Sequence, residues 1–263
     1  MSDILTIERA DGVATLTMRR PESMNSLSVA LKEALLAALE EVAGDDSVRA
    51  VVLAGEGRGF CVGQDLREHV ALLEAGDPAP LRTVRAHYNP ITLAIAEMPK
   101  PVVAAVRGMA AGAGAAFAFA ADFRIGGPST RFLMAFANVA LGADSGASWT
   151  LQRLVGYAKA TELLLLAEPF DVTEADRLGL LTRVVDTDDD VLPAALALAT
   201  RLAAGPTIAY REIKASIAHA AGATLADALE REAQAQAVTG STEDHRNATA
   251  AFVAKEKPVF TGR

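Results

Sequence analysis

Two glycine-rich stretches of this chain combine features that could stabilise an anion. Residues 49–66 and residues 107–122 each place several glycines between a short apolar run and a helix-like pattern. These glycines are Gly55, Gly57, Gly59 and Gly63 in the first stretch, and Gly108, Gly112 and Gly114 in the second. Glycine lets the backbone approach a ligand closely, and a helix N-terminus presents free N–H groups. Two such units can direct two donors at one oxygen, which is the geometry of an oxyanion hole.

Phosphate is a weaker candidate for that anion. Neither stretch contains G-x-x-x-x-G-K-[ST], and the spacing from Gly108 to Gly114 does not match G-x-G-x-x-G. A purely steric explanation also stays open, in which small residues simply allow a tightly packed helix start. The repetition of the pattern favours the oxyanion-hole interpretation.

The flanking sequence predicts the elements that must position these turns. Residues 50–54 and 101–106 are β-branched, apolar runs typical of buried strands. Residues 4–9 and 13–18 form a predicted hairpin across Asp11-Gly12, and residues 28–42 a predicted amphipathic helix. Further predicted elements are a helix from about Gln64, a helix over 81–97, a strand over 123–125, and helices starting near residues 145, 158, 173, 191, 206, 225 and 241.

Composition narrows the class of protein. The chain has 263 residues, of which 51% are hydrophobic, so it can bury one sizeable core. A net charge of −8 argues against nucleic acid and anionic membranes as partners. A single cysteine and no visible signal peptide fit a reducing cytoplasm. The four histidines show no metal-ligand spacing, so no metal is expected.

The two glycine-rich stretches resemble the signature motifs of the crotonase superfamily, the enoyl-CoA hydratases and isomerases. The segments that show this resemblance are Gly-Phe-Cys-Val-Gly-Gln-Asp-Leu at 59–66 and Lys-Pro-Val-Val-Ala-Ala-Val-Arg-Gly-Met-Ala-Ala-Gly-Ala-Gly at 100–114. Segments at 20–27, 154–163, 175–180 and 257–262 resemble other parts of the family in the same order. The resemblance implies an α/β spiral of ββα turns over residues 1–200, carrying the acyl-CoA site. It also implies a helical region over 201–263 that mediates a homotrimer or a dimer of trimers.

The resemblance also implies which residues form the site. The two donors would be the backbone N–H groups of Gln64 and Ala113, holding the thioester oxygen of an acyl-CoA. Coenzyme A would then be part of the substrate, and no separate cofactor is expected. Residues implied to contact or frame the substrate are Arg20, Met24, Cys61, Gly63, Asp65, Leu66, Gly112 and Phe136. Of these, Asp65 could instead cap the following helix, and Cys61 could be a small core residue.

The acid/base group departs from the hydratase pattern. The two positions at which hydratases carry glutamates correspond to Ala116 and Phe136, and neither side chain can transfer a proton. Asp144 is the candidate that remains, in the turn Leu-Gly-Ala-Asp-Ser-Gly-Ala-Ser-Trp at 141–149. Apolar surroundings, expected from Phe132, Met134, Phe136, Val139 and Leu141, would raise its pKa. Its alternative role is that of a helix cap.

The region around Asp144 resembles one subgroup, the bacterial ring-epoxyphenylacetyl-CoA isomerases, which also act as Δ3,Δ2-enoyl-CoA isomerases. That subgroup uses a single aspartate as acid and base, at the position of Asp144. The sequence therefore favours an enoyl-CoA isomerase. Three alternatives stay open. The first is a weak hydratase, the second is another activity on the same fold, such as a hydrolase or a dehalogenase that uses Asp144 as its nucleophile, and the third is a non-catalytic acyl-CoA-binding protein.

Overall fold

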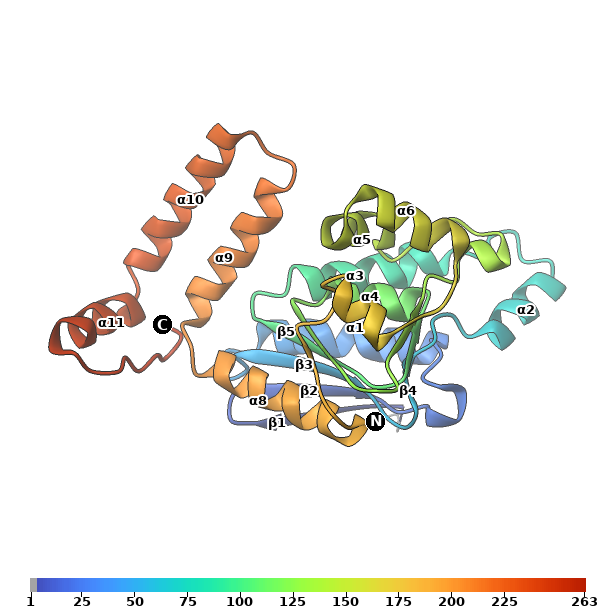
Figure 1. The fold of residues 1–263 in the computed structure, drawn as a ribbon, viewed down its shortest axis with the longest axis horizontal. Coiled ribbons are helices and arrows are strands. Elements are labelled where there is room, and N and C mark those ends of the chain that lie inside the picture. Colours follow the sequence, from blue (N-terminus) through green and yellow to red (C-terminus); the bar gives the residue numbers. More distant parts are fainter. Residues whose placement is uncertain (1–3) are drawn as a thin grey trace.

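A computed structural model describes residues 4–263, and its centre is a six-stranded sheet (Figure 1). The strand order is β1-β2-β3-β5-β7-β10, with β1 and β2 antiparallel and every other neighbouring pair parallel. The strands are β1 Leu5–Ala10, β2 Val13–Met18, β3 Ala50–Gly55, β5 Val102–Val106, β7 Phe123–Gly126 and β10 Arg183–Val184. The predicted hairpin is confirmed: Asp11 and Gly12 both have positive φ, as a tight two-residue turn requires.

A second sheet of four short strands lies beside the first, in the order β4-β6-β8-β9. Its strands are β4 Gly59–Cys61, β6 Met109–Ala111, β8 Arg131–Leu133 and β9 Phe170–Asp171. The strands β4, β6 and β8 are parallel, and each follows a strand of the larger sheet in the chain. The sequence did not predict this sheet, because runs of two or three residues are too short to show a period-two pattern.

Helices cover both faces of the six-stranded sheet. On one face lie α1 Val29–Gly44, α3 Asn89–Ala96 and α4 Ala113–Ala120, which bury Leu39, Ile91 and Phe117 in the main core. On the other face α8 Val191–Ala203 packs Ala195 and Ala199 against alternate residues of the strands. Strands buried on both faces explain why the predicted strands were nearly continuous apolar runs.

The other helices follow the predicted order. Helix α2 Leu66–Glu74 starts two residues later than predicted, because Asp65 is its N-cap. Residues Val84–Tyr88 form a π-helical turn that leads into α3. The remaining helices are α5 Ala147–Val155, α6 Tyr157–Leu166, α7 Val172–Arg177, α9 Thr207–Ala220, α10 Leu225–Gly240 and α11 Glu243–Ala254.

The last three helices stand away from the sheets in Figure 1, with α9 and α10 antiparallel. Residue 200, the predicted boundary, falls inside α8, and the helices that stand apart begin at Thr207. Exposed apolar residues gather on them: Ile213, Ile217, Leu225, Leu229, Phe252 and Val253. No single helix among residues 4–263 is long and apolar enough to cross a membrane; the α8 segment and α9 pass that test only as a pair, bent by 104°.

Candidate active site

Glycines allow the two predicted turns to interlock. A Cβ on Gly114 would lie 2.1 Å from the carbonyl oxygen of Cys61, and one on Gly108 would lie 1.9 Å from that of Arg58. Both contacts are with backbone atoms, which cannot move aside without shifting a strand. Glycine at these positions therefore lets β4 and β6 pair in parallel and brings the ends of both turns together.

The first predicted donor, the N–H of Gln64, comes from an extended segment. The Gly63 carbonyl accepts from Leu27 N–H at 2.8 Å, and Asp65 N–H donates to the Leu27 carbonyl at 3.3 Å. Successive N–H groups of an extended chain point to opposite sides, so that of Gln64 points away from Leu27. The prediction that a helix N-terminus supplies this N–H was therefore wrong, since α2 begins only at Leu66.

The second predicted donor, Ala113, is the first residue of α4, where N–H groups have no partner in the helix. Gly112 before it has φ +50. A Cβ on Gly63 would lie 3.4 Å from the Ala113 nitrogen, which places the two donor segments side by side. Within residues 4–263, neither the Gln64 nor the Ala113 N–H has a hydrogen-bond partner. Two unpaired donors on adjoining segments are what an oxyanion hole requires.

Both donors line a cavity of about 960 Å³, large enough for a sizeable organic ligand. Nine of the residues predicted from sequence share its wall: Arg20, Gly63, Gln64, Asp65, Leu66, Gly112, Ala113, Phe136 and Asp144. Val139 and Leu141 also line it, as expected. Phe132 and Met134 do not; both are fully buried in the main core, so the expectation that they form its wall was wrong.

Among the residues predicted to contact or frame the substrate, Met24 and Cys61 are the two that do not line the cavity. Met24 has φ +49 and packs its side chain beside Gly59. Cys61 is completely buried, and burial raises the pKa of its thiol to about 12. A thiol that stays protonated is a poor nucleophile, so Cys61 acts here as a small core residue.

Asp144 sits in a turn that leaves its carboxylate poorly solvated. Ser145 and Gly146 follow it with φ +52 and +72, and Gly146 rather than Asp144 occupies the N-cap of α5. The Asp144 side chain does not cap this helix; it accepts a hydrogen bond from the Ser145 hydroxyl at 2.8 Å. Burial raises the pKa of Asp144 above its ordinary value, and the Ser145 hydrogen bond offsets only part of this.

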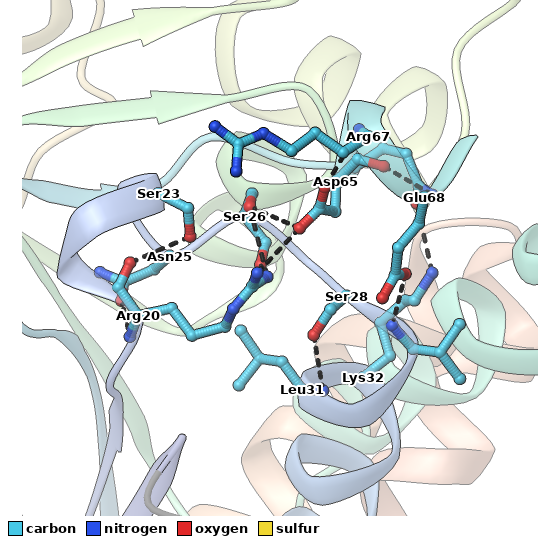
Figure 2. Close-up of polar contacts among 12 residues, drawn as sticks. Arg20, Ser23, Asn25, Ser26, Ser28, Leu31, Lys32, Asp65, Arg67 and Glu68 are labelled. Carbon is cyan, nitrogen blue, oxygen red and sulfur yellow. Dashed lines mark hydrogen bonds and ion pairs between the residues drawn. The ribbon is translucent and has the colours of Figure 1, made fainter. Parts of the chain in front are cut away.

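In contrast to the poorly solvated Asp144 carboxylate, Asp65 lies in a cluster of polar contacts, which Figure 2 shows. It accepts hydrogen bonds from the Arg20 guanidinium at 2.9 Å, the Ser26 hydroxyl at 3.2 Å and the Arg67 N–H at 3.1 Å. Burial alone would raise its pKa, but these contacts hold it below the ordinary value. The cluster fixes the backbone next to Gln64, and the Arg20 guanidinium is engaged in it rather than free.

Sequence reasoning missed a buried cluster behind Gln64. Lys32 of α1 has no exposed surface, and its ammonium donates to Thr83 Oγ1 at 2.7 Å and to Gln64 Oε1 at 3.3 Å. The Tyr88 hydroxyl donates to the same Gln64 oxygen. A signal was present, because Lys32 stands three residues before Leu35 and seven before Leu39, on the apolar stripe of the helix.

Three carboxyl groups line the cavity among the described residues: Glu22, Asp65 and Asp144. Ala116 is fully buried and Phe136 almost so, which leaves apolar groups at the two positions predicted from the family resemblance to correspond to hydratase glutamates. Within residues 4–263, no group of three or more potential ligands could hold a metal ion. The cavity therefore offers two N–H donors and, at Asp144, one carboxylate whose burial makes it a stronger base than usual.

The two interleaved sheets, the helices and the paired donors define the crotonase fold, and comparison with known proteins agrees. Residues 8–263 match the family described as enoyl-CoA hydratase/isomerase, and the chain belongs to this family of the crotonase superfamily. It is therefore a crotonase-family enzyme, for which the family implies an acyl-CoA substrate.

Individual relatives cover almost the whole chain. The 1,2-epoxyphenylacetyl-CoA isomerase of Escherichia coli is 40% identical over 254 residues, 96% of each chain. A probable enoyl-CoA hydratase of Rhodobacter capsulatus is 41% identical over 257 residues, 97% of each chain. The crystal structure of a putative enoyl-CoA hydratase/isomerase from Mycobacterium abscessus superposes with a TM-score of 0.95 at 43% identity, covering 98% of this chain and 100% of that one.

Proposed function

We propose that this enzyme is an enoyl-CoA isomerase, which moves a double bond within an unsaturated acyl-CoA. The observation that carries the proposal is the pairing of one under-solvated carboxylate, Asp144, with two unpaired N–H donors, on Gln64 and Ala113, in a single cavity. Moving a double bond needs one group that removes and returns a proton, and no water. The Asp144 carboxylate and the two N–H donors of the cavity fit that requirement.

The reaction divides into two proton transfers. With a 3-enoyl-CoA, Asp144 takes a proton from C2, and the electron pair moves onto the thioester oxygen to give a dienolate. The N–H groups of Gln64 and Ala113 stabilise that oxyanion; one such donor contributes about 2.7–4 kcal/mol. Protonated Asp144 then delivers the proton to C4, the thioester carbonyl re-forms, and the double bond ends between C2 and C3.

Hydration is the less suitable activity for these residues. It requires groups that hold and activate a water molecule, and the two hydratase glutamates correspond to Ala116 and Phe136. Glu22 and Asp65 are the other lining carboxylates, and Asp65 is already held by Arg20, Ser26 and the Arg67 N–H. The similarity to an isomerase of ring-epoxidised phenylacetyl-CoA supports a substrate of that kind as well as a linear enoyl-CoA.

The family and the exposed apolar surface support a homotrimer or a dimer of trimers. The apolar residues on α9, α10 and α11 form a surface that a subunit interface would cover. Sedimentation equilibrium measures the mass in solution independently of shape. A monomer at micromolar concentration contradicts this part of the proposal.

Product analysis tests the activity. The purified protein is incubated with a 3-enoyl-CoA, a 2-enoyl-CoA, a halogenated aroyl-CoA and ring-epoxidised phenylacetyl-CoA. We expect conjugation of the 3-enoyl-CoA, seen as the absorbance of the conjugated thioester, and its loss in Asp144→Asn. Net addition of water, release of halide, or binding without any turnover each contradicts the isomerase and favours a hydratase, a dehalogenase or a binding protein respectively.

A further inference from the structure

Lys32 lies behind the cavity wall at the point where the wall carries the first oxyanion donor. Gln64, Thr83 and Tyr88 line the cavity, and the Lys32 ammonium contacts all three from the protein side. It lies 5.3 Å from the centroid of the Tyr88 ring. Lys32 itself does not line the cavity, so any influence on a bound thioester acts through these neighbours.

The hydrogen bonds of this cluster have defined directions. An ammonium only donates, so Thr83 Oγ1 must accept from Lys32, which leaves the threonine hydroxyl to donate to His87 Nδ1 at 3.1 Å. Gln64 Oε1 likewise accepts from both Lys32 and Tyr88. Two donors on one amide oxygen restrict the Gln64 side chain, and with it the backbone whose N–H faces the substrate.

We propose that Lys32 is a positioning residue of the oxyanion site: it holds Gln64 in place and supplies a positive charge behind the enolate oxygen. The inference rests on the proposed function, because it concerns the same oxyanion. A fixed charge in a poorly solvated site acts more strongly than in water, and it needs no reorganisation when the enolate forms.

The charges around Lys32 favour its ionised form against the effect of burial. Burial lowers the pKa of the Lys32 ammonium below its ordinary value, and the carboxylates of Glu68, Asp65 and Glu33 offset part of this effect. On the other side, burial and then the Lys32 charge lower the pKa of His87, so the imidazole stays neutral and accepts from Thr83. The three carboxylates therefore oppose the loss of charge from Lys32, whose nitrogen lies 3.3 Å from Gln64 Oε1.

A second buried lysine provides a matched control. Lys100 is also almost fully buried, with a pKa lowered by burial, but its ammonium donates to the carbonyls of Val42 and Asp45 at the far end of α1. That site is about 15 Å along the helix from Lys32. Lys100→Met thus removes a buried ammonium without touching Gln64 or the cavity.

The experiment measures oxyanion stabilisation separately from turnover. A 3-oxoacyl-CoA ionises between its two carbonyls, and its enolate is followed by ultraviolet absorbance when bound to the wild type, Lys32→Met, Lys32→Gln and Lys100→Met. We expect the pKa of the bound ligand to rise by about one unit, a tenfold loss of enolate stabilisation, in both Lys32 variants. We expect no change in Lys100→Met, and unchanged affinity of all variants for a saturated acyl-CoA.

The outcomes separate this inference from the proposed function. An unchanged enolate pKa in a folded Lys32 variant overturns the role of Lys32, even if 3-enoyl-CoA is isomerised. A raised pKa without isomerisation by the wild type keeps the role of Lys32 and overturns the isomerase. If Lys32→Met does not fold, Lys32→Gln provides the same test without the positive charge, since a glutamine amide can still donate hydrogen bonds to Gln64 and Thr83.

Discussion

Two aspartates, Asp65 and Asp144, line the same cavity, and their surroundings shift their pKa values in opposite directions. Asp65 accepts from a guanidinium, a hydroxyl and a backbone N–H, and its pKa is lowered. Asp144 accepts from the Ser145 hydroxyl, and burial raises its pKa. The same functional group is therefore a fixed structural anion at Asp65 and a candidate base at Asp144. The number of donors around each carboxylate decides which.

The largest expected effect is a loss of activity on substitution of Asp144. Asp144→Asn removes the proton acceptor but keeps the shape of the side chain, so we expect turnover of 3-enoyl-CoA to fall by about 10²–10⁴-fold. Binding of a saturated acyl-CoA, measured by calorimetry, should not change. Near-normal turnover in Asp144→Asn would show that the raised pKa reports burial alone and that another group transfers the proton.

The second prediction concerns stability. Asp65→Asn breaks the ion pair with Arg20 and weakens the cap of α2, so we expect a loss of about 2 kcal/mol in the free energy of unfolding, measured with urea. Glu22→Gln is the control, because Glu22 lines the same cavity and is exposed. It should change stability by less than about 0.5 kcal/mol. Equal losses in both variants would contradict the structural role given to Asp65.

The third prediction uses pH to distinguish the role of Asp144 in activity from the role of Asp65 in stability. Activity needs the ionised carboxylate of Asp144, whose pKa is raised. As the pH decreases, activity should therefore begin to fall at a pH above the ordinary pKa range of a carboxyl group. The lowered pKa of Asp65 means that its stabilisation is present above its unfolded-state pKa and is lost only as pH falls through the lowered folded-state value. A pH–rate profile and a pH series of unfolding curves should therefore show activity lost first. Coincident losses would contradict this separation.

The smallest expected effect is a gain in stability at the active site. Because folding raises the pKa of Asp144, its ionised form destabilises the folded state, and stability falls as pH rises through that window. Asp144→Asn removes this cost, so its melting temperature at neutral pH should exceed that of the wild type by about 2 °C. Calorimetric scans at neutral and acidic pH test this, since the difference should vanish in acid. A lower melting temperature would mean that the carboxylate is better solvated than the structure shows.

The amino-acid sequence by itself determined the local features of this protein. Asp11-Gly12 encodes the hairpin, Ser28 and Asp65 cap the helices that follow them, and glycines mark the two turns that approach each other. Each feature depends on residues within a few positions, which is the range over which propensity and capping act. The prediction of Gln64, Ala113 and Asp144 as site residues likewise rests on family motifs that are short and contiguous.

Only the tertiary structure decided which groups share an environment. The short strands of the second sheet exist because segments far apart in the chain pair with one another, and no local pattern signals them. The enclosure of Lys32 by Gln64 and Thr83, 32 and 51 positions later in the chain, likewise depends on packing. Desolvation and charge act through space, so the opposite pKa shifts of Asp65 and Asp144 arise only when the chain has folded.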